Sequence, residues 1–319
     1  MTRIAILMGL LGLAAAHLLL PWSPVEAIRA ANPELVSTLI LELRLPRTLL
    51  ALGYGATLGL TGAALQALFA NPLASPDLTG STSGAALGAV VAAYWLGFST
   101  PLAMALAGSV GALFALGLLI LLAGRQAEPA SLLLAGLAIS LAAGAGTSLA
   151  LALAPSPFAF YDAFDWLMGS FTDRSMSQAA VALIPAGFAV GLIARRAKTI
   201  DMLVLGEDVV AATGLRPRRL ALEIIVLSAI AVGVCVAVCG AIGFVGLIAP
   251  VIARRLSAGH PGRAMIPSSA IGGGLVVLAD LISRTIELDR SIPVGVLTTL
   301  AGTPIFIAIL LSMRRRLTS

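Results

Sequence analysis

Charged and aromatic residues are scarce in this chain. Only 11% of its 319 residues are charged, 5% are aromatic, and lysine occurs once, as Lys198. An ordinary soluble domain has about 25% charged residues. In their place 59% of the chain is hydrophobic, the mean hydropathy is +1.03, and apolar stretches of about 20 residues recur, each long enough to cross a bilayer. The composition therefore argues against a soluble protein and predicts an all-α polytopic membrane protein with a single domain over residues 1–319.

Cysteine and histidine are also rare. The two cysteines, Cys235 and Cys239, lie four residues apart in one apolar stretch. This spacing places them on one helix face but suits a disulfide poorly. The two histidines, His17 and His260, are far from the cysteines in the sequence. Since metal sites need clustered ligands, we expect no metal site and no cofactor bound by this chain.

The motifs of catalysis and of nucleotide binding are absent. The spans contain no HExxH, no GxSxG and no pair of carboxylates, so we expect that the chain is not an enzyme. Lys198 stands in IARRAKTI, without the glycines of a GxxxxGK(S/T) loop, so we do not expect it to bind ATP. The pI near 10.0 comes without aromatic or basic nucleic-acid motifs, and nucleic acid is not an expected partner. Uphill transport by this chain would need energy from another one.

Ten apolar segments could form membrane spans. The first continues through Trp22, which favours an uncleaved helix over a signal peptide. The expected spans are 4–22, 46–69, 79–98, 101–123, 131–154, 176–194, 219–239, 242–257, 264–283 and 293–313. Between the fifth and sixth, residues 155–175 suit a short interfacial helix with its loops.

The basic residues indicate the orientation. With the N-terminus inside and the spans alternating, 14 of the 20 basic residues fall inside and six fall outside. The six outside are Arg29, Arg44, Arg47, Arg174, Arg284 and Arg290. This bias follows the positive-inside rule and predicts that both termini are cytoplasmic.

Small residues recur within the spans. Gly55 with Gly59, and Gly84 with Gly88, form GxxxG pairs. Such pairs let helix backbones approach closely in a membrane. They predict dense helix packing and do not identify a function.

One charged segment interrupts the apolar chain. LGEDVVAATGLRPRR at 205–219 has two acids and three arginines, and RRAK at 195–198 precedes it. Glu207 and Asp208 suit the start of a helix and Gly214 its end. A helix of two turns is marginal alone, so we expect a docking element for a soluble partner, with a solvated loop as the alternative.

Asp280 is the clearest acidic residue within a span. Arg284 follows it at i+4, a spacing that favours a local ion pair. The alternative is a proton relay, because secondary transporters carry buried acids. An ion-coupled secondary transporter is therefore the rival class of function.

Seven blocks of the sequence resemble one transport family, in order. They are RLPRTLLALGYGATLGLTGAALQALFANPLASPDLTGSTSGAALG at 44–88, LLLAG at 132–136, WLMGSF at 166–171, LGEDVVAATGL at 205–215, GAIGFVGLIAPVIARRL at 240–256, IPSSAIGGGLVVLADLISRT at 266–285 and IPVGVLTTLAGTPIFIAILL at 292–311. The family is that of the permease subunits of ABC importers for ferric siderophores, haem and cobalamin. The resemblance covers nearly the whole chain, and NPLASPDLTG and GAIGFVGLIAP are its most specific parts.

The resemblance implies an assembly. It implies ten helices per subunit, a homodimer in the bacterial inner membrane, two cytoplasmic ATPase subunits that hold ATP and Mg, and a soluble substrate-binding protein. A coupling segment at about 199–218, which includes most of the charged segment, is then expected to contact the ATPase. Its expected contact residues are Leu205, Gly206, Glu207, Asp208, Val209, Ala211, Gly214 and Leu215.

The resemblance also assigns roles to outer and central residues. Arg44, Arg47 and Arg284 match arginines that bind glutamates of the binding protein, a pairing that suits the planar guanidinium. Headgroup contact or the Asp280 pair is the alternative. Thr57, Thr61 and Gln66 on the second helix are possible pathway residues, with hydrogen bonding between helices as the alternative. The inner constriction is expected near the turn at 128–131.

No residues of a cargo pocket stand out. We expect a ferric siderophore because it is the commonest cargo of the family, with cobalamin or haem as alternatives for the same machine.

Overall fold

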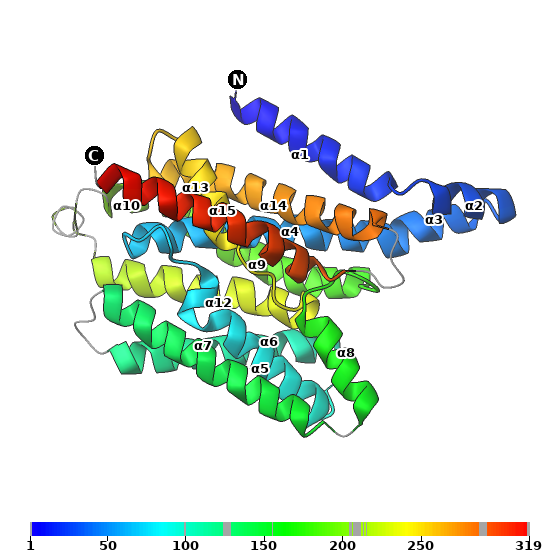
Figure 1. Ribbon diagram of the computed structural model, residues 1–319, viewed down its shortest axis with the longest axis horizontal. Coiled ribbons are helices and arrows are strands. Elements are labelled where there is room, and N and C mark those ends of the chain that lie inside the picture. The colour runs from blue at the N-terminus through cyan, green and yellow to red at the C-terminus, as the bar shows by residue number, and fades with distance from the viewer. Residues whose placement is uncertain are drawn as a thin grey trace.

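The computed structural model describes residues 2–98, 100–123, 129–154, 156–203, 206, 212, 214, 216–286 and 292–317. Every regular element in these ranges is a helix. Figure 1 shows most of the long helices running side by side along the long axis of the molecule. The short helix α10 (Ala197–Met202) lies at one end, and α8 (Pro157–Leu167) and α2 (Ser23–Ala31) lie at the other. These are called the α10 end and the α8 end below.

Each of the ten expected spans contains a helix. They are α1 (Thr2–Leu19), α4 (Leu45–Leu68), α5 (Ser81–Tyr94), α6 (Pro101–Ala123), α7 (Pro129–Ala152), α9 (Met176–Arg195), α12 (Pro217–Cys239), α13 (Val245–Leu256), α14 (Pro261–Thr285) and α15 (Val294–Leu317). The short helix expected within 155–175 is α8.

Length and apolarity identify six of these segments as candidate membrane spans. They are Leu35–Leu68, Pro101–Leu122, Leu134–Ala152, Met176–Arg195, Pro217–Cys239 and Pro261–Thr285. Three shorter apolar helices are Met8–Leu19, Ser81–Tyr94 and Val294–Ile309. The all-α polytopic architecture is therefore confirmed, whereas the count of ten spans and the placement of the termini stay predictions.

The helix before α4 was not expected from the sequence. The short helix α3 (Leu35–Thr38) continues through a π-helical stretch, η1 (Leu39–Arg44), directly into α4. Pro46 lacks an N–H, and its ring would clash with a carbonyl one turn earlier in a regular α-helix. A π-turn widens the backbone locally. The wider turn lets a helix continue through Pro46, the first residue of the expected span 46–69.

Helix α4 lies at the centre of the packing. It contacts α14, α13, α9 and α12, while α12 also contacts α6 and α5, and α1 lies against α14. Its buried side chains include Leu50, Tyr54, Leu58 and Leu65.

Glycines allow the closest helix contacts. A Cβ at Gly55 would collide with the carbonyl of Gly272 on α14, and one at Gly59 with the carbonyl of Ser268. Gly88 on α5 faces the carbonyl of Ala107 on α6 in the same way. The expected close packing at both GxxxG pairs is confirmed.

Candidate functional site

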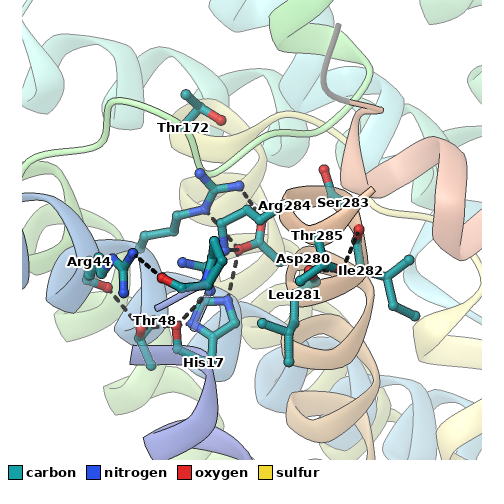
Figure 2. Close-up of polar contacts among 12 residues, drawn as sticks. His17, Arg44, Thr48, Thr172, Asp280, Leu281, Ile282, Ser283, Arg284 and Thr285 are labelled. Atoms are coloured by element: carbon teal, nitrogen blue, oxygen red, sulfur yellow. Dashed lines mark hydrogen bonds and ion pairs between the residues drawn. The ribbon is translucent and has the colours of Figure 1, made fainter. Parts of the chain in front are cut away.

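A buried polar cluster joins three helices at the α8 end. Asp280 of α14 is fully buried. Its carboxylate accepts hydrogen bonds from Nε and Nη2 of Arg47 on α4, both at 2.8 Å, and contacts Nε2 of His17 on α1 at 2.7 Å. The other ring nitrogen of His17 lies 2.8 Å from the hydroxyl of Thr48. Figure 2 shows His17, Thr48 and Asp280 converging, and Arg284 beside them. This set is called the Asp280 cluster.

Two arginines bind the end of α1. Arg44 donates to the carbonyl oxygens of Leu18, Leu19 and Pro21, at 3.2, 2.6 and 2.8 Å. Arg284 donates to the carbonyl of His17 at 2.6 Å. The last carbonyls of a helix have no partner within it, and cations are favoured at that end. The two guanidinium groups therefore fasten α1 to η1 and α14.

The three arginines expected to contact a binding protein come together in this region. Arg44 is 6% exposed, and the side chains of Arg47 and Arg284 are 16% and 11% exposed. The expected ion pair between Arg284 and Asp280 is present, with Nε 3.5 Å from Oδ2, but the shorter bonds come from Arg47. Contact with a binding protein stays a prediction for all three arginines.

Sequence reasoning missed His17, which it treated as isolated. Asp280 lies 263 residues along the chain from it. The sequence nevertheless contained a signal for this contact. Asp280 is the clearest acidic residue within a span, and several arginines were expected on the outer side of the membrane near it. His17 stands near the outer end of the first expected span.

Two adjacent cavities lie beside α15. The first has a volume of about 880 Å³ and is lined by Arg47, Asp165, Asp173 and Arg174, together with apolar residues of α8 and α15. The second has a volume of about 710 Å³. Both are lined by Met168 and Val296, so the two cavities adjoin at these residues.

The second cavity is apolar apart from one carboxylate and two hydroxyls. Asp77 is the only ionisable group among its described lining residues, and Thr299 and Thr303 supply the hydroxyls. Burial raises the pKa of Asp77. Sequence reasoning quoted Asp77 within NPLASPDLTG but gave it no role.

The three possible pathway residues are buried within the packing of α4. The Thr57 hydroxyl donates to the carbonyl of Gly53, and that of Thr61 to the carbonyl of Thr57. The Gln66 amide donates to the carbonyl of Leu247 on α13 at 3.1 Å. Only the Gln66 bond joins two helices, as the alternative interpretation expected, whereas the two threonine bonds lie within α4. None of the three residues lines either cavity. Their place in a pathway stays a prediction.

Two polar contacts hold α10 at its end of the molecule. Arg196 forms a two-bonded fork with Glu223 of α12, at 2.9 and 2.8 Å. That hydrogen bonding, with the charge of Glu223, raises the pKa of Arg196. The carboxylate of Asp201 accepts the N–H of Gly262 at 2.8 Å. Since the first N–H groups of α14 have no partner in their own helix, Asp201 caps α14 from a neighbouring element.

Most of the expected coupling residues lie outside the described residues. These are Leu205, Glu207, Asp208, Val209, Ala211 and Leu215. Gly206 and Gly214 are described, are exposed, and have φ values of +102° and +80°. A positive φ at Gly214 suits the helix-ending role expected for it. Glu128 of the expected inner constriction also lies outside the described part, and α7 begins directly after it.

Metal ligands do not gather in the described part of the chain, which holds no group of three or more His, Cys, Asp or Glu residues able to bind an ion. Cys235 and Cys239 are free and buried in α12.

Several transport permeases are similar to this chain over most of its length. It is 35% identical to the probable siderophore transport system permease protein YfhA of Bacillus subtilis, over 96% of this chain and 94% of that protein. It is 36% identical to the vitamin B12 import system permease protein BtuC of Salmonella typhimurium, over 86% of this chain and 84% of that protein.

A solved structure supports the same grouping. An ABC transporter assigned to the metal-chelate type, in an inward-facing conformation, matches with a TM-score of 0.81 and 28% identity, over 96% of this chain and 98% of that one. The model of the FecCD transport family matches residues 4–312. A chain with this extent of similarity, folded as a bundle of apolar helices, belongs to the FecCD transport family.

Proposed function

We propose that this chain is the transmembrane permease subunit of an ATP-driven importer for a ferric siderophore or a related metal chelate. The observation that supports this most is the family match over residues 4–312, together with permease relatives aligned nearly end to end. Cobalamin and haem are the alternative cargoes, and the B12 permease relatives favour the first of these. The chain itself makes and breaks no bonds.

The proposed assembly follows the sequence expectations. Two copies form a homodimer in the bacterial inner membrane, each with ten spans and both termini in the cytoplasm. Two cytoplasmic ATPase subunits bind ATP and Mg, and a soluble binding protein delivers cargo from outside. The α10 end then faces the cytoplasm, which agrees with the exposed basic residues there: Arg195, Lys198, Arg216, Arg218, Arg219, Arg255 and Arg263.

Coupling is assigned to the segment at about 199–218. Its N-terminal side begins on α10, which Arg196 and Asp201 fasten to α12 and α14. A push by an ATPase on Glu207 or Asp208 would therefore act on two long helices rather than on a loose loop. That anchorage supports a mechanical role for the segment.

The outer mouth is assigned to the first cavity. Arg47 lines it and is the most exposed of the three arginines expected to contact a binding protein. Arg44 and Arg284 donate to carbonyls at the end of α1 and line neither cavity. We therefore assign docking mainly to Arg47, although its Nε and Nη2 also hold Asp280. A volume of about 880 Å³ is within the range of about 300–1,000 Å³ typical of small-molecule sites.

The rival function, an ion-coupled secondary transporter, needs an acid that can exchange protons. Asp280 is bound on both oxygens by Arg47 and contacts His17. A carboxylate held by a guanidinium fork is stabilised in its charged form. This geometry favours a structural role for Asp280 over a relay.

The proposal is tested by ATP hydrolysis in liposomes that contain the chain with the ATPase and the binding protein encoded beside it. Binding protein loaded with ferric siderophore, haem or cobalamin is added in turn. We expect one cargo to stimulate hydrolysis and to accumulate inside. Stimulation by none of the three cargoes, in an assembly that hydrolyses ATP, would overturn the proposal for this cargo class.

A further inference from the structure

The position of Asp77 is fixed by its surroundings. It lies in the short 3₁₀-helix η2 (Pro76–Thr79), between α4 and α5. Its carbonyl accepts a hydrogen bond from the Ser140 hydroxyl of α7 at 3.0 Å. Gly80 follows with φ +78°, and a Cβ there would lie 2.8 Å from Ile139. The backbone is thus held from the α7 side, and Asp77 lines the second cavity.

The other polar side chains of this cavity, Thr299 and Thr303, can also accept hydrogen bonds. The Thr299 hydroxyl donates to the carbonyl of Gly295 at 2.7 Å, and the Thr303 hydroxyl donates to the carbonyl of Thr299 at 2.8 Å. Each hydroxyl has one proton and further lone pairs, so in this arrangement both oxygens have lone pairs free to accept from a ligand. The remaining described lining side chains are apolar. The cavity therefore presents one negative charge and several acceptors.

The first cavity has a different charge balance. Arg47 and Arg174 are matched there by Asp165 and Asp173. A solute that moves from the first cavity to the second leaves a region of mixed charge and enters one with a single carboxylate. An anionic solute would meet a like charge in apolar surroundings, which is costly, whereas an ammonium would gain a charge-assisted hydrogen bond.

We propose that Asp77, with the hydroxyl oxygens of Thr299 and Thr303, binds a cationic hydrogen-bond donor on the cargo. The ligand class is a metal chelate that carries an amine or ammonium group, and anionic chelates are disfavoured. This inference rests on the proposed import function and specifies the cargo that passes through its cavities.

The test compares two cargoes that differ in one charge. One is the iron complex of a linear trihydroxamate with a free terminal amine, and the other is the same complex with that amine acetylated. Uptake of each is measured in liposomes with the complete importer, after confirming that the binding protein loads both. We expect Asp77→Asn to lower the uptake of the amine-bearing complex about tenfold relative to the acetylated one, the size expected for a lost hydrogen bond to a charged group.

Two further variants serve as controls. Asp77→Glu keeps the charge and should retain the preference for the amine. Glu34→Gln removes one charge from an exposed residue that lines neither cavity and should leave the ratio of the two cargoes unchanged. The uptake of the two cargoes is compared within the same variant, so differences between variants in the amount of assembled importer cancel.

The outcomes separate the two proposals. An unchanged ratio in Asp77→Asn overturns the assignment of Asp77 while import itself stands. Absence of ATP-dependent uptake of every cargo in the wild type overturns the import function instead. If Asp77→Asn does not assemble, both complexes are titrated against the wild-type permease and ATPase in detergent. Equal binding of the two complexes there also overturns the assignment.

Discussion

At the scale of single residues, the Asp280 cluster is the most consequential polar feature of the molecule. One buried carboxylate binds Arg47, His17 and Arg284, which belong to α4, α1 and α14. Removing one partner of a buried ion pair leaves the others uncompensated, at a cost of about 3–5 kcal/mol. The cluster therefore holds the first helix to the centre of the bundle.

Asp280→Asn should accordingly lower the free energy of unfolding by about 3 kcal/mol. The measurement is thermal or denaturant unfolding of the purified chain in detergent. Glu223→Gln is the matched control, because it neutralises the partner of Arg196, whose side chain is 43% exposed. Exposed pairs contribute less than about 1 kcal/mol. Equal losses in the two variants would contradict a structural role for the cluster.

The sequence predicted only some of these residue contacts, and the reason is physical. The i,i+4 spacing of Asp280 and Arg284 was readable because a helix fixes such neighbours. The stronger bonds to Arg47 and His17 depend on how separate helices meet, which spacing along the chain does not specify. In the same way, Asp77 stood in a family motif, but only the arrangement of α15 beside it shows a cavity.

At the scale of helices, the contact between α4 and α14 depends on small residues. Gly59 lies against the carbonyl of Ser268, whose hydroxyl donates back to the carbonyl of Gly59 at 2.6 Å. A methyl group at Gly59 would force the two backbones apart and break that bond.

We expect Gly59→Ala to destabilise the protein by about 1–3 kcal/mol, the usual effect of overpacking. The control is Gly187→Ala on α9, where an added Cβ meets no atom within 4 Å. Alanine is the better helix former, so the control should be neutral or slightly stabilising. Both are compared by thermal unfolding in one detergent, and a Gly59→Ala protein as stable as the control would refute the account of this contact.

The helices themselves were largely predictable from the sequence. Apolar runs set the positions of all ten expected segments, because each must satisfy its backbone hydrogen bonds internally in a membrane. The exceptions were α2, α10 and the stretch 35–44, which leads into the span expected to begin at Pro46. The π-turn of η1 that carries the helix through the proline has no comparably simple sequence signal.

At the scale of the whole molecule, we propose that the α10 end contacts an ATPase and the α8 end contacts a binding protein. Reversing Glu207 and Asp208 to lysine should abolish association with the ATPase and leave membrane insertion intact. The reason is that two positive charges would face the partner where two negative charges stood. Co-purification of the ATPase from membranes measures this. Asp173→Lys at the α8 end is the control and should bind the ATPase normally. If the ATPase still co-purifies with the double variant, the proposed coupling role of this segment is wrong.

The dependence of uptake on the partner subunits tests the central claim most directly. Liposomes are prepared with the chain alone, and with the chain plus ATPase and loaded binding protein, each with ATP inside or an imposed proton or sodium gradient. The account predicts accumulation only in the complete assembly with ATP, and none by the chain alone under any gradient. Accumulation by the chain alone, driven by an ion gradient and lost in Asp280→Asn, would contradict it and would establish the secondary transporter instead.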